Sequence, residues 1–320
     1  MRKNYALDMT CGPFFKKILI FSVPLMLTGL LQLAYNTADV VVVGRFVGKE
    51  ALAAVGSTGS LINLFVNLFI GISMGSGVVV ARHIGENNDK GVRECVHTSM
   101  LLSIFCGFFI GVLGFFTSGE MLKIMNAPGD VIDLATLYLK IYFLGSPGLM
   151  AYNFGAAIVR STGDTKRPLY ILTFSGLVNV VLNLFFVIVL KFGVSGVAIP
   201  TIISQYLSAL LIIIHLKRMN NACRLSFRSL RIHSAELRDI LRIGLPAGIQ
   251  SSLFSVSNVV IQSTVNSFGS SAMAGVAAGS NYDAYIYTCT NAISQTTMTF
   301  ASQNMGARKY SNLGRVYRHC

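Results

Sequence analysis

Eight long apolar stretches, separated by clusters of charged residues, constrain this chain more than any other feature of its sequence. Hydrophobic residues make up 53% of the chain and charged residues only 12%, which differs strongly from the balance of a soluble domain. A helix needs roughly 20 apolar residues to cross the hydrocarbon core of a bilayer. The sequence therefore predicts an all-α integral membrane protein with eight transmembrane helices at residues 18–44, 51–80, 96–117, 134–158, 168–190, 194–215, 243–266 and 272–300.

The basic residues are distributed unevenly between the two sets of loops that alternate along these spans. Most of the 26 Lys and Arg residues fall in segments on the same side of the membrane as the N-terminus. The segments on the other side hold only Arg45, Lys49, Lys123, Lys140 and Lys191. Cytoplasmic loops of membrane proteins are enriched in Lys and Arg, so we expect a multi-pass protein of the cytoplasmic (plasma) membrane with its N-terminus inside. The same asymmetry explains the net charge of +13 by topology and lipid-headgroup contact, and it argues against a nucleic-acid partner.

The later part of the chain repeats the first part at an offset of 221 residues. At this offset Gly48 aligns with Gly269 and Gly85 with Gly306. A one-residue shift of this offset in the upstream part aligns Pro24 with Pro246. The offset spans six helices, an even number, so both copies have the same orientation and form a parallel repeat. A second copy as long as the first would end near residue 440, so we expect the sequence to be the N-terminal part of a longer protein.

The repeat predicts a domain organisation with one complete lobe and part of another. We expect a six-helix lobe over 1–220, a basic cytoplasmic linker over 221–242, and the first two helices of a second lobe over 243–320. The linker combines basic and apolar residues, which fits an interfacial helix as well as it fits a solvated loop.

Polar residues follow one face of the first span. Gln32, Tyr35, Asn36 and Asp39 are spaced i, i+3, i+4 and i+7, so they share a face of a helix. A carboxylate inside a membrane span is costly unless it is paired or solvated, and it often marks an ion or substrate pathway. The alternative is that Asp39 lies at the outer membrane interface, because it is about 30 Å along the span from Ile18.

Similar stripes occur in four other spans. They comprise Tyr138 and Tyr142; Ser175, Asn179 and Asn183; Thr201, Ser204, Gln205 and Ser208; and Ser251, Ser255, Asn258 and Gln262. Any single stripe can serve helix packing, but several stripes together with Asp39 favour a shared polar cavity. Asp283, the other carboxylate within a span, either faces the space between the lobes or is satisfied by Asn281 or a neighbouring helix amide.

The spans lack the residue sets typical of an enzyme. The five histidines fall in or beside loops on the side of the N-terminus, and no G-x-x-x-x-G-K-[ST] stretch is present. The six cysteines show no CxxC spacing, so we expect free thiols. We therefore expect a protein that is not an enzyme and does not hydrolyse ATP by a P-loop; if it transports, an ion gradient or a separate subunit must drive it, and we expect no cofactor apart from a coupling ion. An intramembrane enzyme and a non-transporting receptor or assembly subunit are the rivals that these observations disfavour.

The motifs of the chain, taken together, resemble the multidrug and toxic compound extrusion (MATE) family. They are P-x14-D-x4-G in the first span, GKEALAAVG, ARHIGENN, RSTGDTKRP, NVVLN and FASQNMGARKY. The resemblance covers the whole chain and implies twelve spans in two six-helix lobes. It also implies secondary antiport, in which a drug, often cationic and aromatic, leaves as H⁺ or Na⁺ enters. The alternative is a lipid-linked saccharide flippase of the related superfamily, but GKEALAAVG and QNMGA favour the exporter.

The resemblance also implies roles for individual residues. Asp39 matches the ion-coupling carboxylate of the N-terminal lobe, and Asn183 stands where well-studied relatives carry a second Asp, which leaves the coupling ion, H⁺ or Na⁺, open. We expect cation coupling at Asp39, Tyr138, Asn179, Asn183 and Thr201, with Na⁺ a candidate at all of these except Tyr138. We expect a substrate cavity with Gln32, Tyr35, Asn36, Tyr142, Gln205, Asn258 and Asp283, and hinges at Pro24 and Pro246. The expected partners are membrane lipid and small-molecule drugs, and we expect a monomer when the protein is complete.

Overall fold

The computed structural model describes residues 7–124, 129–266 and 270–320, and every regular element in them is helical. The long helices are α1 (Phe14–Phe46), α2 (Lys49–Gly85), α3 (Asp89–Ile124), α6 (Lys166–Leu184), α7 (Ser195–Arg218), α8 (Ser234–Asn266) and α9 (Ser270–Gly306). The short elements are α4 (Gly129–Leu144), α5 (Ser146–Ser161), the π-helical turn η1 (Phe185–Val189), the 3₁₀ turn η2 (Phe227–Ser229) and α10 (Ser311–His319). The predicted all-α fold class is confirmed.

Five of these helices are long and apolar enough to cross a membrane. They are α1, α2, α3, α6 together with its continuation η1, and α7. Helices α8 and α9 have 33 and 37 residues, but their many Ser, Thr and Asn residues make them less apolar than these five. Within the described residues, the structure thus supports five of the eight predicted spans, and the full count of eight stays a prediction.

The predicted fourth span, 134–158, is wrong as a single helix. The chain breaks at Gly145, where α4 ends and α5 begins with Pro147 in its first turn. Proline lacks a backbone N–H and therefore favours the start of a helix over its interior. The break also lets α7 approach closely, because a Cβ atom on Gly145 would collide with the side-chain oxygen of Gln205.

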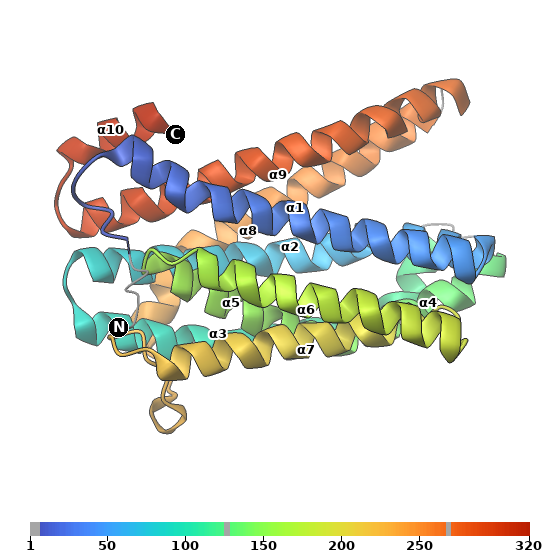
Figure 1. Ribbon diagram of the computed structural model, residues 1–320, viewed down its shortest axis with the longest axis horizontal. Coiled ribbons are helices and arrows are strands. Elements are labelled where there is room, and N and C mark those ends of the chain that lie inside the picture. The colour runs from blue at the N-terminus through green and yellow to red at the C-terminus, as the bar shows by residue number, and fades with distance from the viewer. Residues whose placement is uncertain (1–6, 125–128, 267–269) are drawn as a thin grey trace.

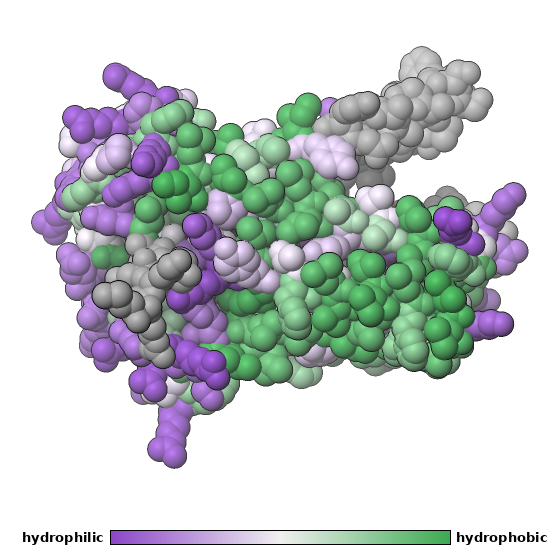
Figure 2. Space-filling model, in the orientation of Figure 1, coloured by the Kyte–Doolittle hydropathy of each residue, from purple (hydrophilic) through white to green (hydrophobic). Residues whose placement is uncertain are grey.

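Helices α1 to α7 form one bundle, and α8 and α9 lie against α1 and α2 (Figure 1). The N-terminal end of the bundle is the end that holds the α2–α3, α5–α6 and α7–α8 connections. The chain terminus at Cys320 lies at this end too (Figure 1). Towards the opposite end, α8 and α9 diverge from α1 and α2. A broad hydrophobic band separates two hydrophilic ends (Figure 2), as expected for a protein that crosses a bilayer.

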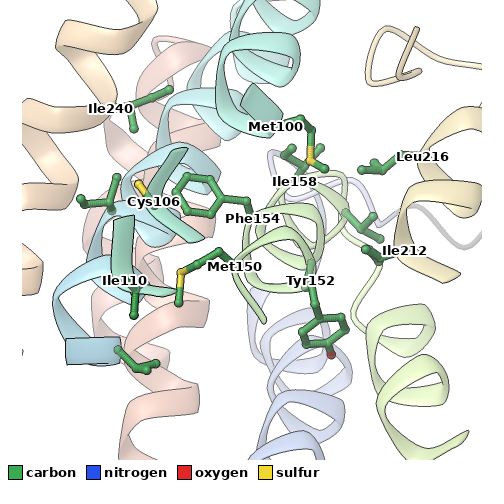
Figure 3. Packing of buried hydrophobic residues seen from close by; sticks show 14 of the residues in the cluster. Met100, Cys106, Ile110, Met150, Tyr152, Phe154, Ile158, Ile212, Leu216 and Ile240 are labelled. Atoms are coloured by element: carbon green, nitrogen blue, oxygen red, sulfur yellow. The ribbon is translucent and has the colours of Figure 1, made fainter. Parts of the chain in front are cut away.

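A buried core joins α2, α3, α5 and α7. Met150, Phe154 and Ile158 on α5 are fully buried and lie between residues of α3, such as Ile110, and of α7, such as Ile212 (Figure 3). Cys106 is part of this core, and all six cysteines are free thiols, as predicted. The core fixes the helices that surround the polar site described below.

The helices reproduce the predicted repeat in length and in turn geometry. Helices α1 and α8 both have 33 residues, and α2 and α9 both have 37. The turn after α2 has a left-handed residue at Asn87, and the turn after α9 has one at Arg308, each with φ of 54°. A Cβ atom on Gly85 would collide with the carbonyl oxygen of Gln303, and one on Gly306 with that of Arg82. This reciprocal contact is the pattern expected across a two-fold axis.

Candidate functional site

Four polar side chains from α1, α6 and α7 form a continuous hydrogen-bonded network inside the bundle. The Asn183 side-chain amide donates to Asp39 Oδ1, and it lies 3.3 Å from Asn179 Oδ1, to which it also donates. Asn179 Nδ2 in turn donates to Thr201 Oγ1 at 3.4 Å, and Thr201 donates to the Val197 carbonyl oxygen at 2.9 Å. The i, i+4 spacing of Asn179 and Asn183 places both amides on the face of α6 that meets α1 and α7.

Two tyrosines of α4 line the same region. Tyr138 is only 6% exposed, and its ring stacks on that of Tyr142 with 6.3 Å between the ring centroids. Tyr138 belongs to the same buried cluster as Val43 of α1 and Val197 of α7, which are each one helical turn from a residue of the network. The side-chain oxygen of Gln205 of α7 and the carbonyl oxygen of Tyr142 both lie next to Gly145. The five residues predicted for cation coupling are therefore brought together, and Tyr142 and Gln205 lie with them.

The oxygen atoms of this network are suitable ligands for a hard monovalent cation. Asn183 Oδ1 is buried and has no hydrogen-bond partner among the described residues, although buried polar atoms are normally satisfied. Beside it are the Asp39 carboxylate, the Asn179 amide oxygen and the Thr201 hydroxyl, and oxygen ligands of this kind are those that hard cations prefer. The residues thus fit Na⁺, and the lone carboxylate fits a proton equally well. In the described part of the chain, no group of three His, Cys, Asp or Glu residues suggests a transition-metal site.

The polar stripe of α1 is divided between two environments. Tyr35 faces α6, where its hydroxyl donates to the Thr173 carbonyl oxygen at 3.2 Å and its ring packs against Gly176. Gln32 and Asn36 are exposed. The four residues share a face of the helix, but at 100° per residue the stripe is about 100° wide, so its two edges meet different surroundings. Its Tyr35–Asp39 edge faces the bundle, and its Gln32–Asn36 edge does not.

The remaining substrate-cavity candidates are less well placed by the structure. Asp283 is exposed on α9, one helical turn before Tyr287, which stacks on Phe254 of α8. The side chain of Asn258 lies outside the described residues. A single shared cavity for all seven candidates therefore stays a prediction.

Both predicted hinge prolines lie inside continuous helices. Pro24 is buried in α1, and its carbonyl oxygen accepts a hydrogen bond from Thr28 Oγ1 at 2.7 Å. Pro246 lies in α8 between Gly244 and Gly248, whose backbones touch α2. A proline inside a helix removes one backbone hydrogen bond and favours bending there, so the hinge roles stay predictions with a physical basis.

A charged cluster at the N-terminal end joins α2 to the first turns of α8, and the sequence alone did not reveal it. Arg82 donates to Asp239 Oδ2 at 2.5 Å, and His83 Nε2 lies 3.1 Å from Glu236 Oε2. Glu86 adds contacts of 3.0 Å to His83 and 3.7 Å to Arg82. The partners are more than 150 residues apart, so no spacing along one helix could indicate them. The cluster ties the six-helix lobe to α8, which begins at Ser234 and therefore takes up the last part of the predicted linker 221–242.

We expect the Arg82–Asp239 pair to contribute measurably but modestly to stability. Both side chains are more than a third exposed, and exposed ion pairs are typically worth about 0.2–1 kcal/mol. A double-mutant cycle with Arg82→Gln and Asp239→Asn, measured by thermal unfolding in detergent, should give a coupling free energy of about 0.5 kcal/mol. The Lys90–Glu94 pair, which lies within one helix at 3.9 Å and in which Lys90 is 85% exposed, is the control and should show a smaller coupling, because i,i+4 pairs on a helix are worth about 0.3–0.5 kcal/mol at most. Equal coupling in both pairs would contradict a role in joining the lobes.

Comparison with known proteins agrees with this geometry. The MatE family model matches residues 24–185 and 246–320. A probable multidrug resistance protein of Bacillus subtilis, YpnP, is 29% identical over 94% of this chain and 67% of its own length. The probable multidrug resistance protein NorM of Thermotoga maritima is 27% identical over 96% of this chain and 67% of its own length. The chain thus spans about two thirds of the length of these curated relatives.

A solved structure has the same arrangement of helices. An outward-facing multidrug resistance MATE transporter superposes with a TM-score of 0.89 and 26% identity, covering 100% of this chain and 70% of its own. The family match extends over both copies of the repeat and includes Asp39, Asn179 and Pro246. The chain belongs to the MATE family of multidrug transporters.

Proposed function

We propose that the protein is a secondary active transporter that exports small-molecule drugs across the cytoplasmic membrane in exchange for a cation. The observation that carries this proposal is the Asp39–Asn183–Asn179–Thr201 network. No basic residue forms an ion pair with Asp39 in the part of the chain that the structure describes. A membrane carboxylate held by neutral groups keeps the freedom to bind and release a cation.

Relatives named as multidrug resistance proteins support the export of drugs. The exposed amides of Gln32 and Asn36 lie on α1 beside the contact of Gly29 with Thr288 of α9. They can therefore meet a substrate between the two predicted lobes, while on the adjacent edge of the same stripe Asp39 belongs to the cation network and Tyr35 packs against α6. Substrates of this site would be small compounds, often cationic and aromatic.

The arrangement of the helices supports alternating access with the N-terminus inside the cell. The lobes are tied together at the N-terminal end by the Arg82–Asp239 and His83–Glu236 contacts. Towards the other end α8 and α9 diverge from α1 and α2 (Figure 1). With the N-terminus inside, this is an outward-open arrangement, which agrees with the similarity to an outward-facing transporter. Rocking of the lobes about the central site would then expose the opposite side.

We propose H⁺ as the coupling ion. The resemblance to the family implies a second carboxylate at the position where this chain has Asn183, so the site would hold one negative charge fewer. This loss weakens Na⁺ binding directly, because the attraction between two unit charges about 4 Å apart is about 4 kcal/mol in a partly buried site. A single carboxylate can still take up and release a proton.

The test is dye efflux under pH and Na⁺ gradients that are imposed separately. In cells that express the protein carrying this chain, we expect a pH gradient alone to drive efflux of a cationic dye such as ethidium. Asn183→Asp restores the second carboxylate and should raise Na⁺ stimulation at fixed pH at least 10-fold, which corresponds to about 1.4 kcal/mol. Asn220→Asp, an equal charge change at an exposed residue after α7, is the control. Strong Na⁺ dependence of the wild type, unchanged in Asn183→Asp, would refute the assignment of the coupling ion.

A further inference from the structure

The connection between α7 and α8 carries a dense positive charge that the proposed transport reaction does not use. Between Leu216 and Ala235 the sequence contains no Asp or Glu, and its basic residues are Lys217, Arg218, Arg224, Arg228 and Arg231. All five side chains are exposed. None of them takes part in an ion pair within the described residues, so their charge is not neutralised by the protein.

This connection is anchored to the bundle along its length. Cys223 and Leu225 are buried in the main core, and the Leu225 N–H donates to the Leu216 carbonyl oxygen at 3.2 Å. The Ser226 N–H donates to His97 Nε2 at 3.2 Å, and the His233 N–H donates to Thr98 Oγ1 at 3.0 Å. The segment is thus a fixed loop up to the start of α8 at Ser234, and a single interfacial helix over 221–242 is not formed.

Two apolar side chains are displayed among the basic residues. Phe227, in the turn η2, is 54% exposed, and Ile232 is 42% exposed. Lys217 Nζ lies 4.8 Å from the centroid of the Phe227 ring, a distance typical of a cation–π contact. The loop leaves the bundle sideways next to the end of α7, and hydrophilic side chains project there (Figures 1 and 2). Exposed apolar groups with surrounding cations are typical of segments that bind the membrane interface.

We propose that the α7–α8 loop is a binding site for the headgroups of anionic phospholipids. In this site Phe227 and Ile232 enter the boundary between headgroups and acyl chains, and the five cations contact the lipid phosphates. A sideways projection from the end of a membrane-crossing bundle places the loop over the neighbouring headgroups instead of in bulk solvent. Each Lys or Arg near an anionic surface contributes about 1 kcal/mol, which is about 5-fold in affinity. The site acts independently of which ion or drug is transported.

The absence of tryptophan from the chain gives a direct probe of this site. Phe227→Trp places the single indole of this chain in the loop, and its emission can be followed while the detergent-solubilised chain is titrated with short-chain phosphatidylglycerol. We expect a saturable blue shift with phosphatidylglycerol and none with phosphatidylcholine or inorganic phosphate. Tyr317→Trp on α10, where Tyr317 is 82% exposed at the same end, is the control and should show no shift.

Removing charges from the loop, and in a control from the other end of the molecule, distinguishes a specific lipid site from a general attraction of the basic protein to anionic lipid. In the Phe227→Trp background, Arg224→Gln with Arg228→Gln should weaken phosphatidylglycerol binding about 25-fold. Arg45→Gln with Lys49→Gln removes the same charge from exposed positions at the other end and should leave binding unchanged. Equal shifts with both lipids, a shift with inorganic phosphate, or equal losses in the two charge variants would each overturn the proposal.

Discussion

Asp39→Asn should abolish drug efflux, reducing it to the level of cells without the transporter, while the protein remains inserted and abundant. The physical reason is that an amide cannot bind or release a proton at physiological pH and attracts a cation far less than a carboxylate does. The substitution preserves size, and the new side-chain oxygen can still accept the hydrogen bond from Asn183. The fold should therefore be kept while the coupling chemistry is lost.

The measurement is dye efflux together with the amount of protein in purified membranes. Asp133→Asn is the matched control, because Asp133 is an exposed carboxylate on α4 outside the network. It should transport like the wild type. Efflux by Asp39→Asn at the wild-type rate would show that coupling does not depend on this carboxylate, whereas loss of the protein from the membrane would indicate a structural role.

Only part of the polar network could be predicted from helix geometry, and the grouping of residues from α1, α6 and α7 was implied by the resemblance to the family. Asn179 and Asn183 are one helical turn apart, so their shared face follows from the helix period alone. The cost of a carboxylate in a span singled out Asp39. The repeat could also be predicted from the sequence: the offset that aligns Gly85 with Gly306 also pairs α2 with α9, and these two helices have equal lengths.

Features that depend on how two helices are rotated against each other could not be predicted in this way. The stripe of α1 indicates one polar face, but the position of α6 decides that Tyr35 is packed and Asn36 exposed. Pro147 is a sequence signal for the break at Gly145, but the close approach of Gln205 of α7 to this glycine is not revealed by any property of the span 134–158. The Arg82–Asp239 contact joins helices that are distant in sequence. Periodicity gives the faces of a helix, and tertiary packing selects which face meets which neighbour.

Gly75→Val should separate α2 from α8 and strongly destabilise the protein. A Cβ atom on Gly75 would lie 2.6 Å from both the Gly244 nitrogen and the Ile240 carbonyl oxygen. These are backbone atoms, so a side-chain rotation cannot relieve the overlap and one helix must move. Overpacking typically costs 1–3 kcal/mol, and a backbone contact should place this variant near about 3 kcal/mol in the free energy of unfolding.

Thermal unfolding in detergent measures the loss of stability, and a cross-link measures the separation of the helices. Asn67 Nδ2 lies 3.3 Å from Ser255 Oγ, so cysteines at these two positions in a background without other cysteines should be joined across the α2–α8 contact by a short bifunctional thiol reagent. Gly75→Val should slow this cross-linking. Gly56→Val is the control, because a Cβ atom on Gly56 of the same helix meets no atom within 4 Å. Equal stability and equal cross-linking in the two variants would contradict a glycine-mediated contact. A difference confined to Gly75 would show that the small residues on both sides of Pro246 hold the second lobe against the first.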